Sequence, residues 1–278
     1  MLIALALAVG LVAAGFTADA ARSATGAPSR SLPDVALHRS ASRAVAPTAA
    51  AKSSVDLVQA LPGATVSVQV DGRTVGSQLS LGKVVGPVAL AVGAHEVRFE
   101  PTGGAPATAA TITVESGSVH DVVLHAPADP SGDPVVSVFR TPDAPIAAGK
   151  ARVLLAHAAE VGAGDIWVDG QKAFTSITNG QYAQADVPAG PHSVAIRPAG
   201  QTGKPILGPL SVDLAAGTVT LAYAVGNPAQ GGMSVVAHAV RLEPDGSVTP
   251  LRIHTGSAGL AAKLRVRGFG TLPRRAHR

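Results

Sequence analysis

An internal repeat constrains the fold of this chain more than any other feature of its sequence. The segment VLLAHAAEVGAGDIWVDG at residues 153–170 recurs in edited form as VDLVQALPGATVSVQVDG at residues 55–72, with no insertion or deletion. Residues 93–103 and 190–200 correspond in the same way, at almost the same spacing along the chain. A nearly constant spacing between matching segments indicates two copies of one structural unit. The sequence therefore predicts a tandem repeat.

The repeated segment has the pattern of a β hairpin. Val66, Val68 and Val70 alternate with polar residues, which is the two-residue period of a strand with one face in a core. Asp71-Gly72 follows in the first copy and Asp169-Gly170 in the second. This dipeptide accepts the positive φ angles of a tight two-residue turn. We expect each strand to fold back at this turn.

The predicted fold class is all-β, with two tandem immunoglobulin-like antiparallel β-sandwich domains. A chain of 278 residues suits two domains of roughly 100 residues with flanks. We place the first domain at residues 54–140 and the second at residues 150–242, each with short strands separated by turn signals. A small β barrel is the alternative. The candidate strands lie near residues 55–60, 65–70, 87–92, 95–100, 109–114, 119–124 and 134–139, and near residues 152–157, 165–168, 172–174, 182–187, 192–197, 210–214, 218–224 and 233–240.

Residues 141–149 form the predicted linker between the two domains. Pro142 and Pro145 exclude a central strand at this point. Alanine, valine and glycine dominate the composition, and aromatic residues make up only 3% of it, so we expect thin cores. A proline-containing joint between thin cores predicts two domains that reorient and unfold separately.

Residues 1–20 have the composition of a secretory signal peptide. Leu2 to Phe16 form an apolar run that is too short for a comfortable transmembrane helix, and Ala18-Asp19-Ala20 offers small residues to a signal peptidase. No Lys or Arg precedes the run, and a start upstream of Met1 would explain that absence. The alternatives are an uncleaved anchor and a buried element of the fold. We expect export, cleavage after Ala20 and no transmembrane helix in the mature chain.

Positive charge is concentrated in the flanks and not in the domains. Residues 54–250 carry 10 Lys and Arg against 16 Asp and Glu, whereas residues 251–278 carry seven basic residues and no acid. We expect residues 21–53 to be a disordered linker and residues 243–278 to be a flexible basic tail. Such a tail suits cell-wall or envelope polymers with negative charge, with simple solvation of the chain end as the alternative. Nucleic acid is not an expected partner, because the domains are acidic and lack a basic face interleaved with aromatics.

Three segments of the second copy carry a family resemblance. They are residues 153–170, residues 186–200 (DVPAGPHSVAIRPAG) and residues 210–226 (LSVDLAAGTVTLAYAVG). In this order and spacing, the sequence from Arg152 to Val225 resembles the secreted bacterial family named domain of unknown function 4397 (DUF4397). The first copy resembles a degenerate version of it that lacks the tryptophan. The resemblance implies an exported, β-rich protein and brings no catalytic residues.

No catalytic or phosphate-binding signature occurs in the sequence. There is no cysteine, no serine in a Gly-x-Ser-x-Gly elbow and no glycine-rich phosphate loop. We therefore predict a non-enzymatic protein without a cofactor. The alternative is a secreted hydrolase or lyase with an unrecognised site in the second domain, and clustering of His157, His192 and Asp165 would be its sign.

The histidines favour structural roles over metal binding. His95 and His192 occupy equivalent positions in the two copies, and an imidazole there can donate an N–H to a backbone carbonyl at the sandwich rim. His157, His192 and His238 lie on predicted strands and in principle form a three-histidine metal site. No His-x-His or His-Glu-x-x-His spacing supports such a site, so we predict no metal.

Trp167 is the sole tryptophan and the one candidate ligand-binding residue. Core packing is the more ordinary role for it, but an exposed indole beside Tyr182 or Tyr223 would stack on a sugar ring. The leading hypothesis is an exported, non-enzymatic, cell-envelope-associated or secreted protein that acts as a binding or spacer module. A carbohydrate-binding module that uses Trp167 is an alternative, and the oligomeric state is left open.

Overall fold

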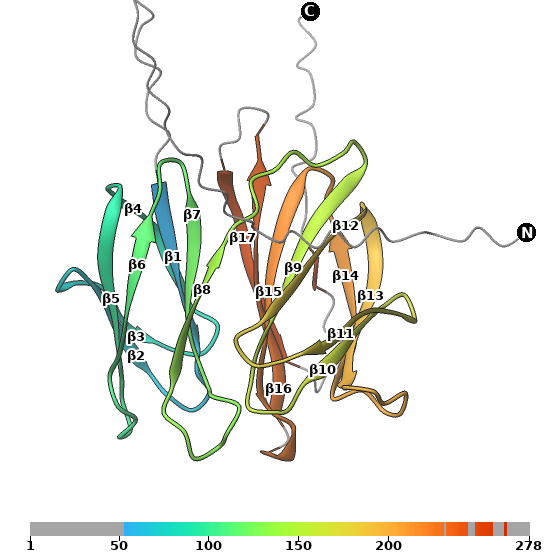
Figure 1. Ribbon diagram of the computed structural model, residues 1–278, viewed down its shortest axis with the longest axis horizontal. Coiled ribbons are helices and arrows are strands. Elements are labelled where there is room, and N and C mark those ends of the chain that lie inside the picture. The colour runs from blue at the N-terminus through green and yellow to red at the C-terminus, as the bar shows by residue number, and fades with distance from the viewer. Residues whose placement is uncertain (1–52, 231, 244–247, 258–263, 266–278) are drawn as a thin grey trace, which may run out of the picture. The chain divides into compact units, whose positions relative to one another are not determined.

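The structure is a computed structural model that describes residues 53–230, 232–243, 248–257 and 264–265 (Figure 1). All of them belong to one compact unit. The expected signal peptide and the disordered linker up to residue 52 lie outside the described residues. No helix in the described part of the chain is long and apolar enough to cross a membrane.

The first half of the described chain forms two sheets. Sheet A has the strand order β4-β1-β7-β8 and sheet B has the order β3-β2-β5-β6. All neighbouring strands are antiparallel except β1 and β7, which run parallel. The strands are β1 (Ser53–Ala60), β2 (Val66–Val70), β3 (Arg73–Leu79), β4 (Val84–Leu90), β5 (Gly93–Pro101), β6 (Thr108–Val114), β7 (Val119–His125) and β8 (Val135–Arg140).

The second half repeats this strand order and adds one strand to each sheet. Sheet C has the order β12-β9-β15-β16-β17 and sheet D has the order β11-β10-β13-β14-β18. The all-β class and the tandem sandwiches are therefore confirmed, and the described strands form open sheets and no barrel. A short 3-10 helix, η1 (Pro228–Gln230), precedes β16. The strands are β9 (Lys150–Ala159), β10 (Gly164–Val168), β11 (Gln171–Ile177), β12 (Tyr182–Pro188), β13 (Gly190–Pro198), β14 (Leu207–Leu214), β15 (Thr218–Asn227), β16 (Gly232–Leu242), β17 (Val248–Ser257) and β18 (Leu264–Arg265).

The predicted hairpin turns are confirmed in both halves. Asp71 and Gly72 have φ angles of 49° and 75°, and Asp169 and Gly170 have φ angles of 50° and 77°. Two successive positive φ angles give the tight turn whose twist matches that of the flanking strands. The turns join β2 to β3 and β10 to β11, so both returning strands are edge strands of their sheets.

Sheets A and B enclose a filled apolar core. Val68, Val97 and Phe99 point into it from sheet B with no exposed surface, and Leu57 and Val122 meet them from sheet A. The alternating burial of β2, β5 and β6 follows from this, because only one face of sheet B is covered.

Sheets A and C pack against each other and form a second apolar core. Its members come from both halves of the chain, and the first half lies beside the second in Figure 1. Sheets A and C are therefore covered on both faces, and β15 is buried at almost every position instead of at alternate positions. The shared core is made of Val58, Ala60, Val123, Phe139, Leu154, Ala156, Ala158, Val219, Leu221, Tyr223, Val225, Val236 and Val240.

The segment between the two halves is packed, contrary to the expected reorientation of the two domains. Thr141 is buried, and Ile146 packs against the core between sheets A and C. The guanidinium of Arg152 donates to the carbonyl oxygen of Ala144 at 2.7 Å and to the carboxylate of Asp186 at 2.6 Å and 2.8 Å. Proline breaks the strand pattern here, but these contacts hold the segment against the second half.

Part of the expected flexible tail is a strand. Residues 248–257 form β17, which pairs antiparallel with β16 from Leu242↔Val248 to Ser234↔Ser257. This pairing supplies the backbone hydrogen bonds that an uncovered β16 edge would lack. Arg252 is the one Lys or Arg of this strand, so the positive charge of residues 251–278 as a whole is a poor guide to where the fold ends.

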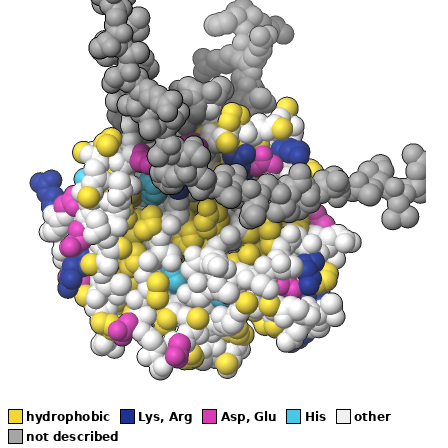
Figure 2. All heavy atoms as spheres, viewed as in Figure 1, with side chains coloured by type: hydrophobic (Ala, Val, Ile, Leu, Met, Phe, Trp, Pro, Cys, Tyr) yellow, Lys and Arg dark blue, Asp and Glu magenta, His cyan; other side chains and the backbone are white. Residues whose placement is uncertain are grey.

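Charged and apolar side chains are unevenly spread over the face seen in Figure 2. Most of the charged side chains lie toward its periphery, and hydrophobic side chains gather near its middle. Val138 of β8 and Tyr182 of β12 are 42% and 48% exposed. The ring of Tyr182 meets the buried ring of Phe139 edge-on, with 5.8 Å between their centroids.

In each half of the chain, a contact between an aspartate of the hairpin turn and a histidine of a neighbouring strand stabilises the turn. We call this contact the aspartate–histidine link. Asp71 Oδ2 lies 2.7 Å from His95 Nδ1, and Asp169 Oδ2 lies 2.7 Å from His192 Nδ1. The hydrogen bond to Asp71 is the main cause that raises the pKa of His95, and the same bond lowers the pKa of Asp71. For His192, burial lowers the pKa but the hydrogen bonds to Pro188 and Asp169 outweigh it, so the pKa is raised overall.

These two links predict a stability contribution that is limited to mildly acidic pH. A histidine with a raised pKa stabilises the fold fully below its unfolded pKa of 6.5 and loses this contribution as pH rises through the folded pKa. An aspartate with a lowered pKa contributes above its unfolded pKa of 3.8 and loses this contribution as pH falls through the folded pKa. Both contributions coexist between about pH 4 and about pH 6.5.

The double variant Asp71→Asn/Asp169→Asn tests this prediction. Urea denaturation should show a larger loss of stability at about pH 5.5 than at about pH 9, because the histidines carry charge only at the lower pH. Asp133→Asn, which changes an exposed aspartate outside the links, is the control and should have little effect at either pH. An equal loss for the double variant at both pH values would contradict the assigned role of the links.

The core between sheets A and C predicts that both halves unfold together. Phe139→Ala removes a ring that is 1% exposed and contacts the ring of Tyr223, and such truncations cost about 3–5 kcal/mol. Calorimetry of the native protein should show one transition. Trp167 fluorescence, which reports on the second half alone, should show the destabilisation caused by Phe139→Ala in the first half.

Val138→Ala is the matched control, because Val138 is adjacent in sequence and 42% exposed. It should leave the transition nearly in place. Two calorimetric transitions, or a Trp167 transition that does not respond to Phe139→Ala, would show that the halves are independent.

Candidate functional site

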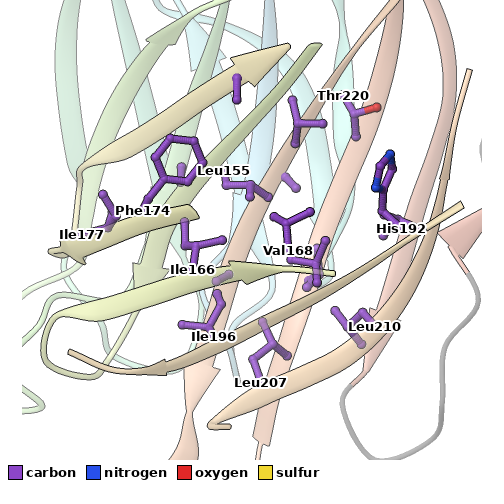
Figure 3. A pocket seen from close by; sticks show the side chains of 18 of the residues that line it. Leu155, Ile166, Val168, Phe174, Ile177, His192, Ile196, Leu207, Leu210 and Thr220 are labelled. Atoms are coloured by element: carbon purple, nitrogen blue, oxygen red, sulfur yellow. The ribbon is translucent and has the colours of Figure 1, made fainter. Parts of the chain in front are cut away.

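A cavity of about 90 Å³ lies between sheets C and D, in the interior of the second sandwich (Figure 3). Its wall is almost entirely apolar, and strands of both sheets contribute to it. Side chains labelled in Figure 3 converge on it from both sheets, among them Leu155, Ile166, Val168, Phe174, Ile177, Ile196, Leu207 and Leu210.

The cavity follows from smaller side chains at positions that are filled in the first sandwich. The parallel register places Val122 beside Leu57 in sheet A and Ala222 beside Leu155 in sheet C. The repeat makes Leu57 equivalent to Leu155, so Ala222 stands where the first half has Val122. Loss of two methyl groups at this position leaves space that the neighbouring strands do not close.

Two further substitutions enlarge the space in the same way. Ala224 lies on β15 two residues after Ala222, and its equivalent on β7 is Leu124. On sheet D, Ile196 stands in the place of Phe99. Phe99 has no exposed surface, whereas Ile196 is partly exposed, as a residue that lines a cavity is. The second sandwich therefore has the strand arrangement of the first but smaller side chains at these interior positions.

Two polar atoms with unused hydrogen-bonding capacity belong to residues of the cavity wall. Nδ1 of His157 and Oγ1 of Thr220 are buried and have no hydrogen-bond partner among the described residues. His157 Nε2 lies 3.1 Å from the carbonyl oxygen of Gly162, so Nε2 carries the proton and Nδ1 is an acceptor. Burial lowers the pKa of His157, which favours the neutral ring. The wall therefore suits an apolar ligand with one hydrogen-bonding group.

His192 lies at the cavity as well, but its ring is already engaged. Besides the link to Asp169, its Nε2 lies 2.8 Å from the carbonyl oxygen of Pro188. His95 makes the equivalent contact, with 2.9 Å from Nε2 to the carbonyl oxygen of Ala91. The predicted structural role of both histidines at the sandwich rim is confirmed.

The residues of the alternative hydrolase hypothesis do not come together. Asp165 is buried, and its carboxylate accepts from the backbone N–H groups of Ser176 and Gly200 and pairs with Lys172 Nζ at 2.7 Å. The hydrogen bond to Lys172 is the main cause that lowers the pKa of Asp165. Since His157 and His192 have other partners, the three side chains form no shared hydrogen-bond network among the described residues.

Trp167 lies on the outer face of sheet D and not in the core. Ile166 points into the cavity, so the neighbouring residue of the strand points to the opposite face. The guanidinium carbon of Arg197 lies 4.8 Å from the centre of the Trp167 ring, and Lys172 Nζ lies 5.7 Å from it. The core-packing interpretation of Trp167 was therefore wrong, and two cations occupy positions over the ring that a stacked sugar would need.

A separate polar cluster lies between sheets A and C. Asp56 and Asp121 are neighbours on the parallel strands β1 and β7, and they are 4% and 0% exposed. The Tyr223 hydroxyl donates a hydrogen bond to Oδ2 of Asp121, and His238 Nε2 contacts the same oxygen. His238 does not approach His157 or His192 in a metal-binding group among the described residues.

Burial dominates the electrostatics of this cluster. It raises the pKa of Asp56 to about 6, with a further increase from the neighbouring charge of Asp121. Burial lowers the pKa of His238, but the two aspartates reverse this effect and the pKa is raised overall. A Cβ at Gly86 would lie 2.0 Å from Oδ1 of Asp56, so only glycine leaves room for this carboxylate. Sequence analysis missed the cluster because no spacing rule links its members.

A more open cleft of about 450 Å³ lies where the loops of both halves meet. Its wall is rich in proline and glycine and includes Asp133, Glu160 and Asn227. Asn227 Oδ1 already accepts from the backbone N–H of Ala229 at 2.8 Å. The cleft presents few side chains that would select a ligand, so the apolar cavity is the stronger candidate site.

Comparison with known proteins supports the family resemblance. The model of the family described as Domain of unknown function (DUF4397) matches residues 53–164. This range contains the whole first sandwich, the strand β9 and the first residue of β10, whereas the three motifs that suggested the resemblance all lie in the second sandwich. No curated protein matches the chain. Over residues 53–164, the chain is similar to the DUF4397 family, whose function is unknown.

Proposed function

We propose that this chain is an exported, non-enzymatic protein that binds a small apolar ligand in the cavity between sheets C and D. On this proposal the chain contains two tandem copies of the family domain. The first copy is the structural one, and the second copy carries the site. The family match and the shared strand order of the two halves support this arrangement.

The single observation that carries the proposal is the contrast between the two sandwich interiors. Proteins rarely leave an apolar interior unfilled, because each unfilled space loses packing energy. The first sandwich shows that this framework can be filled, since Phe99 and Val122 have no exposed surface. An apolar interior that stays open in the second sandwich can hold a bound small molecule.

The size and chemistry of the cavity restrict the ligand. A volume of about 90 Å³ is smaller than the apolar cavity of about 150 Å³ that holds benzene, so it suits a short alkyl chain. The unpaired Nδ1 of His157 accepts a hydrogen bond, and the Thr220 hydroxyl donates or accepts one. We infer a ligand class of short-chain alcohols or short-chain acids in their neutral form.

Filling the cavity tests the proposal. The double variant Ala222→Val/Ala224→Leu restores the side chains of the first sandwich and should raise stability by about 1–2 kcal/mol. It should also abolish binding of n-alcohols from propanol to hexanol, measured by thermal shift and by chemical-shift changes of the cavity methyl groups. The native protein should bind with a preference for one chain length.

Trp167→Ala is the control for this experiment, because Trp167 points away from the cavity. It should leave alcohol binding unchanged. Equal alcohol responses of the native protein and the filled variant would contradict binding in the cavity. Loss of binding to wall polysaccharide in Trp167→Ala alone would favour the carbohydrate-binding alternative instead.

Association with the cell envelope is the second part of the proposal. The sequence of residues 1–20 supports export, and the basic residues after β17 support attraction to anionic polymers. Because β17 belongs to sheet C and β18 belongs to sheet D, a deletion that tests the tail alone must keep residues 248–265 and begin at residue 266.

Deletion of residues 266–278 removes four of the seven basic residues that follow Pro250. The deletion should weaken adsorption to isolated cell walls, and added salt should weaken adsorption of the intact protein, since exposed charges are screened within about 10 Å at 0.1 M salt. Adsorption that resists both salt and the deletion would place the contact on the folded domains.

A further inference from the structure

The polar cluster between sheets A and C has no part in the function proposed above. Asp56, Asp121 and His238 are each no more than 5% exposed, and they lie in a contact that is otherwise apolar. Charged side chains in such a place are costly unless something compensates them.

The fold itself does not require carboxylates at these positions. In the second half, Leu154 and Leu221 are partners on the parallel strands β9 and β15, as Asp56 and Asp121 are on β1 and β7. Both leucines are buried in the same contact between sheets A and C. An apolar pair therefore satisfies this framework, and the aspartate pair must have another role.

The geometry of the cluster is that of a set of metal ligands. One ligand atom from each of Asp56, Asp121 and His238 lies within 4.8 Å of the other two. Oδ1 of Asp121 is completely buried and has no hydrogen-bond partner among the described residues. Two carboxylates face a single imidazole, so the cluster offers two acidic side chains and only one basic side chain.

We propose that Asp56, Asp121 and His238 bind one divalent first-row transition metal ion, with Zn²⁺ as the best fit to the donor set. Two carboxylate oxygens and one imidazole nitrogen are ordinary ligands of Zn²⁺, and the imidazole disfavours Ca²⁺ and Mg²⁺. The ion takes the place of the proton between His238 Nε2 and Asp121, and that proton leaves to solvent.

Tyr223 supports the ligand set without being part of it. Its hydroxyl donates to the Asp121 carboxylate, and such outer contacts orient a metal ligand. The fourth coordination position is left to water or to the second oxygen of a carboxylate. Because its ligands come from β1, β7 and β16, the ion joins the two halves of the chain and binds when sheets A and C come together.

The experiment uses the full chain, because the site is buried and spans both halves. The protein is unfolded in guanidinium chloride with EDTA and then refolded with or without Zn²⁺. After removal of free metal, elemental analysis should give one zinc per chain in the first sample. The zinc-refolded protein should also melt at a higher temperature than the metal-free protein, since a ligand of the native state stabilises it.

The double variant Asp56→Leu/Asp121→Leu copies the pair of the second half, so it should fold. It should bind no zinc, and its melting temperature should not depend on zinc. His238→Gln is a second variant that removes one ligand and should also lose zinc. The pair Asp71→Asn/His95→Gln removes an aspartate–histidine link elsewhere and should retain one zinc per chain.

Two results would overturn the proposal. One is a native protein that refolds with no zinc above the buffer blank and with an unchanged melting temperature. The other is full zinc content in Asp56→Leu/Asp121→Leu, which would place the ion at another site. Neither result affects the cavity proposal, because alcohol binding is measured in the second sandwich and needs no metal.

Discussion

The contact between sheets A and C is the constraint on which the rest of the structure depends. Each sandwich covers only one face of its inner sheet, and the second face of each inner sheet is covered by the other. Small side chains make this close approach of two sheets feasible, because alanine and valine fill most of the contact. Phe139 and Tyr223 are the large exceptions, and their rings meet with 5.5 Å between centroids. The two sandwiches therefore behave as one unit, despite the prolines between them.

In this arrangement, one part of the fold supplies stability and another part contains the cavity, whereas a single sandwich would have to do both. The inner sheets A and C give the fold its shared core, and the core of the first sandwich includes the ring of Phe99, which has no exposed surface. The second sandwich is held in place by the shared core on one side, so its own interior tolerates Ala222 and Ala224 and stays open. A binding cavity costs stability, and the neighbouring cores offset that cost. The proposed ligand-binding cavity lies at the positions where the second copy has smaller side chains than the first.

Sequence patterns predicted the strands and turns well, because these depend on local alternation and on local φ preferences. The alternation of Val66, Val68 and Val70 and the turn at Asp71-Gly72 are examples. The strand β3 (Arg73–Leu79) has no apolar alternation, since it is an edge strand with mostly exposed side chains, and only the turn before it announces it. The strand β17 was missed because it was grouped with the basic residues that follow it, although Arg252 is its one Lys or Arg.

Features that depend on which surfaces meet could not be predicted from one chain. The apolar residues on both faces of β15 indicate a strand that is covered twice, but nothing in them names sheet A as the partner. Asp56 and Asp121 are far apart in sequence, and only the parallel register brings them together. The cavity is visible as the change from Leu124 to Ala224 only after the two copies are superimposed. The prediction for Trp167 was wrong in another way: a lone tryptophan was expected to pack in the core, but it lies on the outer face of sheet D.

Diffraction from crystals pressurised with xenon tests the central claim most directly. Xenon is apolar, and it binds wherever an apolar interior has room for it. We expect a xenon atom between sheets C and D, in contact with Ala222 and Ile196, and none in the first sandwich. A second sandwich without xenon, or equal occupancy in both sandwiches, would contradict the claim that the second copy has opened its core for a ligand.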